Sequence, residues 1–197
     1  MKRNATALIL IDPQNDFLSE DGKLYEAVKP VLDKTNVIEK LNGLLDKFHE
    51  NDMMVIHTPI TIEPDQMGNP DDLYGVMKPV AQSGGFIRGS KGAQVADVLN
   101  TDESDLIIEK HHICAFEGTD LDKVLRENGI ETVVLAGLLT DVCVEATMRI
   151  AYDRGYEVYT VTDATATLDE AKQNMTVEYS YPLFSKPVLA ENIQSII

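Results

Sequence analysis

Short apolar runs alternate with helical patterns along this chain, and that alternation constrains the fold more than any other feature. Five runs show little polar alternation, which is typical of strands buried on both faces of a sheet. They are residues 6–11 (TALILI), 53–57 (MMVIH), 105–109 (DLIIE), 132–135 (TVVL) and 157–161 (EVYTV). Because helical segments separate these strands, the pattern predicts an α/β fold with a parallel sheet and helices on both of its faces.

The segments between the strands have the apolar spacing of amphipathic helices. Helices are expected over residues 31–50, 119–128, 144–154 and 168–178. Thr119 is expected to cap the second of these helices and Gly129 to end it. A last apolar run, residues 187–190, is expected to add one more strand.

Residues 59–93 differ from the rest of the chain because they are rich in Pro, Gly, Asp and Met, with at most a short helix near 73–80. Long excursions of this kind are usually functional or disordered. We interpret this one as a lid or an oligomer contact within a single domain of residues 1–197, since 197 residues form one ample domain.

The charge balance and the cysteine count exclude several classes of function. With 17 Lys and Arg against 33 Asp and Glu, the net charge of −16 argues against nucleic-acid binding, which needs a basic surface. No apolar run reaches membrane-spanning length, and the N-terminus leads into a strand rather than a signal peptide. Two cysteines are too few for a disulfide scaffold, so a reduced, cytoplasmic setting is expected.

Three chemically able residues follow predicted strands at their carboxyl ends, where ligands bind in sheets of this type. Asp12 follows the first strand, Lys110 follows DLIIE, and Cys143 follows the fourth strand after a short turn. A helix N-terminus should lower the pKa of the Cys143 thiol, although a small buried residue filling the corner is equally compatible with its position. A buried lysine needs an anionic partner, which Asp12 would supply, and Asp12 could accept the thiol proton.

Other polar residues near these strand ends have simpler interpretations. Asp16 is expected to brace its loop through backbone groups. His57, His111 and His112 lack the paired spacing of metal ligands, so no metal is expected. Cys114 is expected to be a core or pocket-wall residue.

Further candidates could touch a substrate. Phe17 and Phe116 could line a pocket, although plain core positions are equally plausible. Arg88 and Lys91 could bind a carboxylate, but solvated loop charges are the expected state.

Three segments carry a resemblance to a known family. IDPQNDF (11–17), EKHHICAFEGTDLDKVLRENGI (109–130) and VVLAGLLTDVCVEATMRIAYDRGYEVYTVTDATAT (133–167) resemble the isochorismatase-like cysteine hydrolases, and the resemblance extends over about residues 5–190. It implies a three-layer α/β/α sandwich around a six-stranded, mainly parallel sheet. It also implies a catalytic triad of Asp12, Lys110 and Cys143.

The resemblance further implies a cis peptide bond between Leu138 and Leu139, just before the nucleophile. The backbone N–H groups of Leu139 and Cys143 would then form the oxyanion hole, and Leu138 would shape the pocket beside them. A homo-oligomer, dimer or tetramer, and a small-molecule substrate are also expected by this resemblance.

Departures from the family pattern narrow the expected activity. Nicotinamidases of the superfamily carry an Asp-x-His metal motif after the second strand, where this chain has VIHTPIT, so no metal or other cofactor is expected. Isochorismatases proper cleave a vinyl ether without a cysteine nucleophile. Cys143 therefore favours hydrolysis of a C–N bond in a small amide, ureide or carbamoyl compound through a thioester. Vinyl ether hydrolysis and a non-enzymatic thiol redox or regulatory role remain the alternatives.

Overall fold

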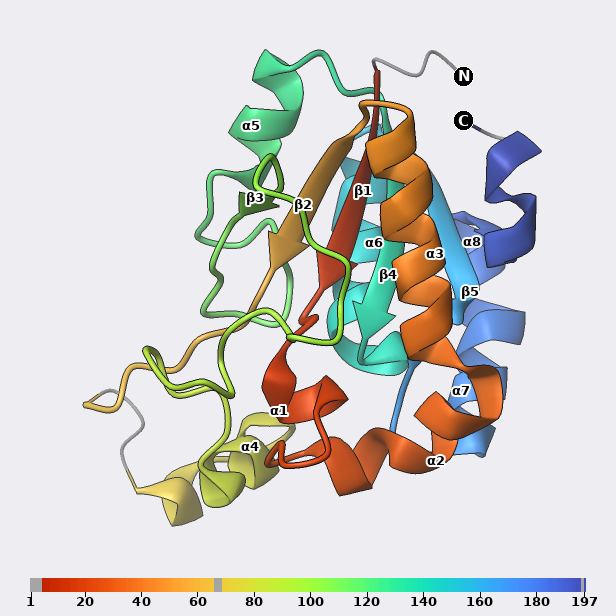
Figure 1. Ribbon diagram of the computed structural model, residues 1–197. Helices are drawn as coiled ribbons and strands as arrows, with labels where there is room; N and C mark the ends of the chain where they lie inside the picture. Colours follow the sequence, from red (N-terminus) through yellow and green to blue (C-terminus); the bar gives the residue numbers. More distant parts are fainter. Residues whose placement is uncertain (1–4, 66–68, 196) are drawn as a thin grey trace.

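The computed structural model describes residues 5–65, 69–195 and 197, and its centre is one six-stranded sheet. All neighbouring strands are parallel, in the order β3-β2-β1-β4-β5-β6 (Figure 1). The strands are β1 (Thr6–Ile11), β2 (Met54–Thr58), β3 (Leu106–Ile107), β4 (Thr132–Leu138), β5 (Glu157–Ala166) and β6 (Lys186–Val188). The predicted parallel sheet, including its sixth strand, is confirmed.

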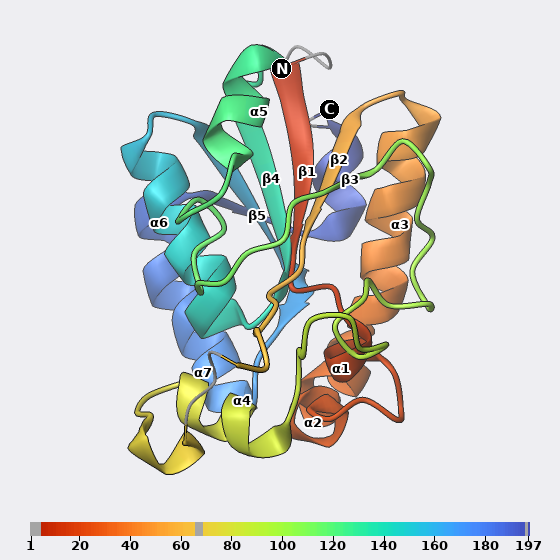
Figure 2. The same ribbon diagram turned by 90° about the vertical axis from the view of Figure 1, so that its left-hand side faces the viewer.

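Helices cover both faces of this sheet, which gives the predicted three layers (Figure 2). α3 (Val37–Glu50) lies on one face, and α5 (Leu121–Glu127) and α6 (Glu145–Asp153) lie on the other. The remaining helices are α1 (Asn15–Leu18), α2 (Tyr25–Thr35), α4 (Met77–Ser83), α7 (Glu170–Met175) and α8 (Tyr181–Phe184).

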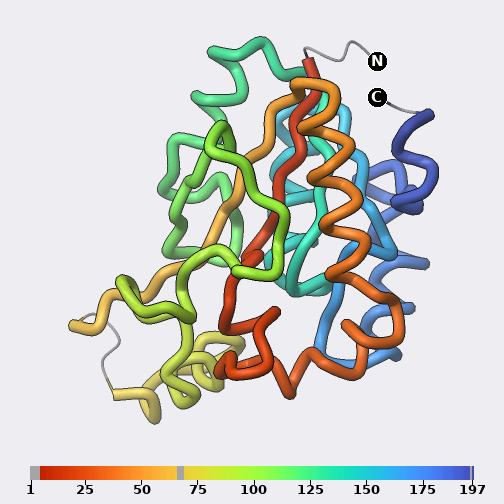
Figure 3. The backbone as a smooth tube through the Cα atoms, in the orientation of Figure 1, coloured from red at the N-terminus to blue at the C-terminus, as the bar shows by residue number. Residues whose placement is uncertain are grey.

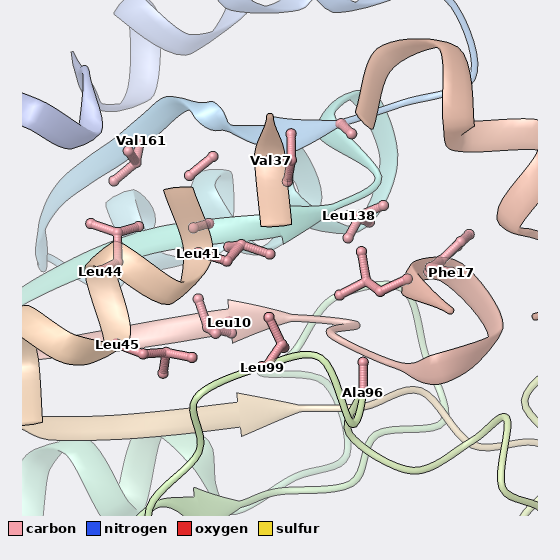
Figure 4. Close-up of a cluster of buried hydrophobic side chains, with 14 of the residues drawn as sticks. Leu10, Phe17, Val37, Leu41, Leu44, Leu45, Ala96, Leu99, Leu138 and Val161 are labelled. Atoms are coloured by element: carbon pink, nitrogen blue, oxygen red, sulfur yellow. The ribbon is translucent and has the colours of Figure 1, made fainter. Parts of the chain in front are cut away.

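Side chains alternate along β1 into two hydrophobic cores, because successive residues of a strand point to opposite faces. Leu8 and Leu10 pack with α2 and α3, and Figure 4 shows Leu10 beside Leu41 and Leu45 of α3. Ala7, Ile9 and Ile11 pack instead with α5, α6 and α8. The central strands are therefore buried on both faces, as their unbroken apolar runs predict.

Three local expectations are wrong. The single helix expected over residues 31–50 is two helices, because Asn36 adopts a left-handed conformation with φ 51°. The expected both-face burial of DLIIE does not hold, because β3 is a two-residue edge strand with both residues exposed. Thr119 is not the N-cap residue of α5, which is Asp120; from two positions before the helix start, the Thr119 hydroxyl accepts a hydrogen bond from Leu121 N–H at 3.2 Å.

The described parts of residues 59–93, which are 59–65 and 69–93, extend past the carboxyl ends of the strands, as the tube in Figure 3 shows. α4 is the helix of this excursion, and an isolated parallel bridge between Ile62 and Ile87 joins its two limbs. Gln14 fastens it to the sheet: its amide donates to Ile60 O at 2.8 Å and Ala93 O at 2.9 Å, and accepts from Ile60 N–H at 2.9 Å. None of the described helices combines the length and the apolar character that crossing a membrane requires.

Candidate active site

Asp12, Lys110 and Cys143 converge just beyond the carboxyl ends of the central strands. Asp12 immediately follows β1 and adopts φ 48°, a left-handed conformation that Asp tolerates better than most residues. Lys110 is carried by a chain segment that pairs with Ile60, beyond β2. Cys143 lies in a π-helical turn, Thr140–Val144, that joins β4 to α6. Residues far apart in the sequence thus meet at the carboxyl ends of the strands.

Lys110 and Asp12 form an ion pair that is closed to solvent. Nζ lies 2.8 Å from Oδ1, and the two side chains are 0% and 1% exposed. Lys110 Nζ also donates to His112 O at 3.1 Å. Neither Asp12 oxygen has a well-aligned hydrogen-bond donor among the described residues, so the contact holds the carboxylate by charge. The oxygens remain able to accept a proton.

Burial and charge shift the pKa of both partners. Burial raises the pKa of Asp12, and the Lys110 charge opposes that shift without cancelling it. For Lys110, burial by itself would lower the pKa, but the opposing effect of its ionic partners, the Asp12 carboxylate above all, raises the pKa. Lys110 is therefore a permanent cation at neutral pH, and the site holds one positive charge that needs one negative charge beside it.

The Cys143 thiol faces Asp12, and its pKa is raised rather than lowered. Burial is the main cause, since Cys143 is 7% exposed, and the Asp12 charge adds to it. Lys110 and the Leu139 N–H favour the thiolate, but they do not compensate. The expected depression of this pKa by the helix N-terminus is therefore wrong, because burial and the Asp12 charge exceed the effects that favour the thiolate.

The turn before Cys143 is built by close packing and buried hydrogen bonds. Gly137 has φ 112°, and a Cβ there would lie 2.1 Å from Ile11 O, so only glycine is accommodated. The Leu138–Leu139 peptide bond is cis, as predicted. Leu139 O accepts hydrogen bonds from Val142 N and Val144 N, both at 3.1 Å.

A buried polar network holds the same turn from the C-terminal part of the chain. Thr140 Oγ1 donates to Gln173 Oε1 at 2.6 Å, and the Tyr181 hydroxyl donates to Thr140 O at 3.1 Å. Gln173 Nε2 in turn donates to Thr165 O at 3.1 Å. We did not expect Gln173 and Tyr181 at the site from the sequence, because nothing in their local pattern links them to Cys143.

The segment after Asp12 is structural apart from Asp12 itself. Asp16 Oδ2 accepts from Phe86 N–H at 2.6 Å and Oδ1 accepts from Lys23 N–H at 3.2 Å, which confirms its expected bracing role. Gln14, which the sequence pattern does not single out, binds Ile60 O and Ala93 O near the Asp12 carboxylate. Its place two residues after Asp12 is the one signal that could have indicated it.

The three pocket candidates all lie in the cores. Phe17 packs against Phe86 with ring centroids 4.9 Å apart, and Leu138 belongs to the same core and is fully buried. Phe116 stacks on Tyr156 at 6.0 Å in the opposite core, which also contains Cys114 and Cys143. The structure therefore favours the core interpretation that was left open for both phenylalanines.

Three histidines contact protein oxygens, and two of them, His49 and His57, share the Asp105 carboxylate. His57 Nε2 lies 2.9 Å from Asp105 Oδ2, and His111 Nδ1 lies 3.0 Å from Thr61 O. Within the described ranges, no group of three or more His, Cys, Asp or Glu side chains is arranged to hold a metal ion.

The family is decided by comparison with known proteins. The family model described as the isochorismatase domain matches residues 6–192, nearly the whole chain. The chain belongs to the isochorismatase family. As a member, it is a hydrolase of the α/β type, and the resemblance inferred from its motifs is confirmed.

The proteins similar to this chain include amide-cleaving enzymes. The ureidoacrylate amidohydrolase RutB of Caulobacter segnis is 30% identical over 171 residues, which cover 81% of this chain and 72% of the relative. A cysteine hydrolase from Pseudomonas syringae pv. phaseolicola has a similar structure, with a TM-score of 0.80, 26% identity and coverage of 98% and 92% of the two chains. The N-carbamoylsarcosine amidase of Thermoplasma acidophilum has a TM-score of 0.71 at 29% identity, covering 94% and 96%.

Proposed function

We propose that this isochorismatase-family hydrolase cleaves a C–N bond of a small amide, ureide or carbamoyl compound through a thioester on Cys143. The meeting of the buried Asp12–Lys110 ion pair with the nearly buried Cys143 thiol is the observation that carries this proposal. The amidohydrolase and amidase among the similar proteins support the same bond type.

Charge balance explains why the three residues act together. A buried thiol with a raised pKa does not ionise by releasing its proton to water. Transfer of that proton to Asp12 converts a carboxylate and a thiol into a carboxylic acid and a thiolate, so the number of negative charges beside Lys110 stays at one. The raised pKa of Asp12 makes it a better base than an ordinary carboxylate. Proton transfer to Asp12 is therefore the route to the nucleophile.

Attack and collapse then follow with protons accounted for. The thiolate adds to the carbonyl carbon, and the oxyanion is received by the N–H groups of Leu139 and Cys143. As the C–N bond breaks, Asp12 returns its proton to the leaving nitrogen, and an acyl or carbamoyl thioester remains. Asp12 next takes a proton from the attacking water, and it returns that proton to the Cys143 sulfur as the thioester breaks.

The test is intact mass spectrometry under acid quench during turnover of a slow amide, combined with an assay of released ammonia. We expect an acyl adduct on Cys143, and loss of hydrolysis in Cys143→Ala with the fold retained. Cys143→Ser should be nearly as inactive, because a hydroxyl is much harder to ionise than a thiol. Substantial activity in Cys143→Ala would overturn the proposal and favour attack without a covalent intermediate, as in vinyl ether hydrolysis.

A thiol sensor without turnover is less well supported. Such a protein needs a thiolate at neutral pH, whereas the pKa of Cys143 is raised by burial and by Asp12. A sensor also has no use for a buried acid that protonates a leaving group.

A further inference from the structure

A small cavity lies where residues 59–93 meet the segment that carries Lys110. Its volume is about 180 Å³, and its walls include apolar Ile62, Leu73 and Met77 and polar Thr61, Glu63 and His111. Since an engineered cavity of about 150 Å³ binds benzene, this cavity has room for a group of that size. That is the size of a short side chain or a small ring.

The inner wall of the cavity is bonded directly to the catalytic segment. Thr61 N–H donates to Lys110 O at 2.8 Å, and His111 is the residue after Lys110. Figures 1 and 2 both show α4, which supplies Met77, beyond the carboxyl ends of β1 and β2. Larger cavities lie elsewhere: two of about 640–650 Å³ are lined by residues of β3 and its neighbours, Leu106 among them, and one of about 240 Å³ lies on the other side of Thr61, against residues 89–95 and Glu109.

The cations near this cavity are already engaged. Residues 59–93 contain three Lys and Arg residues, namely Lys78, Arg88 and Lys91. Arg88 pairs with both Glu63 and Glu109, Lys91 pairs with Asp97 at 3.0 Å, and Lys78 Nζ donates to Asp71 O at 3.3 Å. Among the described residues that line the cavity there is no Lys or Arg, and Glu63 supplies the carboxylate of its wall.

We propose that this cavity binds the non-reacting end of the substrate, and that this end is uncharged. The inference rests on the proposed amide or ureide hydrolysis and narrows its substrate class. A carboxylate in the cavity would lose its hydration without gaining a cation, and it would face Glu63. A cationic end would compete with Arg88 for the same carboxylate. An apolar or neutral polar end matches walls made mainly of Ile62, Leu73 and Met77.

Shape-matched probes separate charge from size. Isocaproamide and succinamate are both primary amides and differ in whether the far end is an isopropyl group or a carboxylate; isobutylurea and N-carbamoylglycine are the corresponding ureide pair. With ammonia release as the readout, we expect the neutral member of at least one pair to have a kcat/KM higher by about 10- to 100-fold. Equal or faster turnover of the acids would overturn the inference while leaving the proposed hydrolysis intact. No turnover of any probe would count against the proposed function itself, and the inference would fall with it.

Two variants assign the preference to this cavity. Glu63→Gln removes the wall carboxylate and leaves Arg88 with one partner, so the disadvantage of the acids should shrink by roughly tenfold. Glu103→Gln removes the same charge from an exposed position before β3 and should change nothing. Leu73→Arg places a cation in the wall and should favour the acids. Equal shifts in Glu63→Gln and Glu103→Gln, or an unchanged preference in Leu73→Arg, would show that the cavity does not select the substrate.

Discussion

Two lysines of this chain hold carboxylates at nearly equal distances in opposite surroundings. Lys110 lies 2.8 Å from Asp12 with both side chains closed to solvent, and Lys91 lies 3.0 Å from Asp97 with 67% and 62% of the two side chains exposed. Water already stabilises the exposed charges, so their attraction adds little, whereas each buried charge depends on the other. Burial, rather than distance, decides which pair matters to the molecule.

A substitution in the buried pair should have its largest effect on the rate of catalysis. Asp12→Asn cannot accept the thiol proton, so kcat should fall by about 10²–10⁴, the usual contribution of a general acid–base group. Alkylation of Cys143 at neutral pH should slow in the same variant. An unchanged alkylation rate alongside normal hydrolysis would contradict the role of Asp12.

The pH dependence of kcat/KM is a second test of the role of Asp12. Burial raises the pKa of Asp12, so the group stays protonated up to a higher pH than an ordinary aspartate. Because the base must be ionised to act, kcat/KM should fall as the pH is lowered through this raised pKa, above the usual value of 3.8. An acid limb at or below that value would contradict the assignment. The profile is measured with a substrate that does not titrate in this range.

Lys110→Met should show the cost of breaking a buried pair. It leaves the Asp12 carboxylate without a partner, and the free energy of unfolding should fall by about 3–5 kcal/mol in urea titration. Adding Asp12→Asn to this variant should recover much of the loss, because no uncompensated charge remains. If the double variant were no more stable than Lys110→Met, the loss would reflect packing rather than charge.

The pair also makes stability depend on alkaline pH. The pKa of Lys110 is raised in the folded chain, so its contribution is complete below the unfolded value of 10.5 and is lost as the pH rises through the folded pKa. The wild type should therefore lose more stability above this range than the Asp12→Asn, Lys110→Met double variant does.

The sequence was sufficient to place Asp12, Lys110 and Cys143 together at the carboxyl ends of the strands, because parallel strands all end on the same side of a sheet. It was not sufficient for the pKa of Cys143, since the dipole argument is local while desolvation depends on packing across the sheet. The sequence also did not show that β3 is an edge strand, because an apolar run such as DLIIE occurs both in edge strands and in central strands. The break at Asn36 had a signal, since Asn tolerates a left-handed conformation.

Gln173 offers an intermediate case between the buried pair and the exposed one, since it is buried, polar and uncharged. Gln173→Leu leaves the Thr140 hydroxyl and Thr165 O without their partner, and the free energy of unfolding should fall by about 1–3 kcal/mol. Since Thr140 belongs to the turn that carries Cys143, kcat should fall more than KM rises. Gln194→Leu, at an exposed position, is the matched control. Equal effects of the two variants on kcat would contradict a positioning role for Gln173.

Lys91→Ala tests the exposed pair, and the expected effect is very small. Solvent screens Lys91 and Asp97, so the urea midpoint and kcat should both remain within replicate error of the wild type. A loss of activity comparable to that expected for Asp12→Asn would break the comparison, and it would give Lys91 a role in substrate binding that its ion pair does not suggest.

Removal of divalent metal should have no effect at all. The described residues contain no cluster of metal-binding side chains, and the remaining residues, 1–4, 66–68 and 196, contain no His, Cys, Asp or Glu that could complete one. His57 Nε2 already contacts Asp105, and an activated water is not required when a thiolate attacks first. Dialysis against a strong chelator should therefore leave kcat/KM unchanged. If activity disappeared and returned with zinc, iron or manganese, the charge balance of Asp12, Lys110 and Cys143 would no longer be a sufficient account of catalysis, because a fourth charge would be taking part.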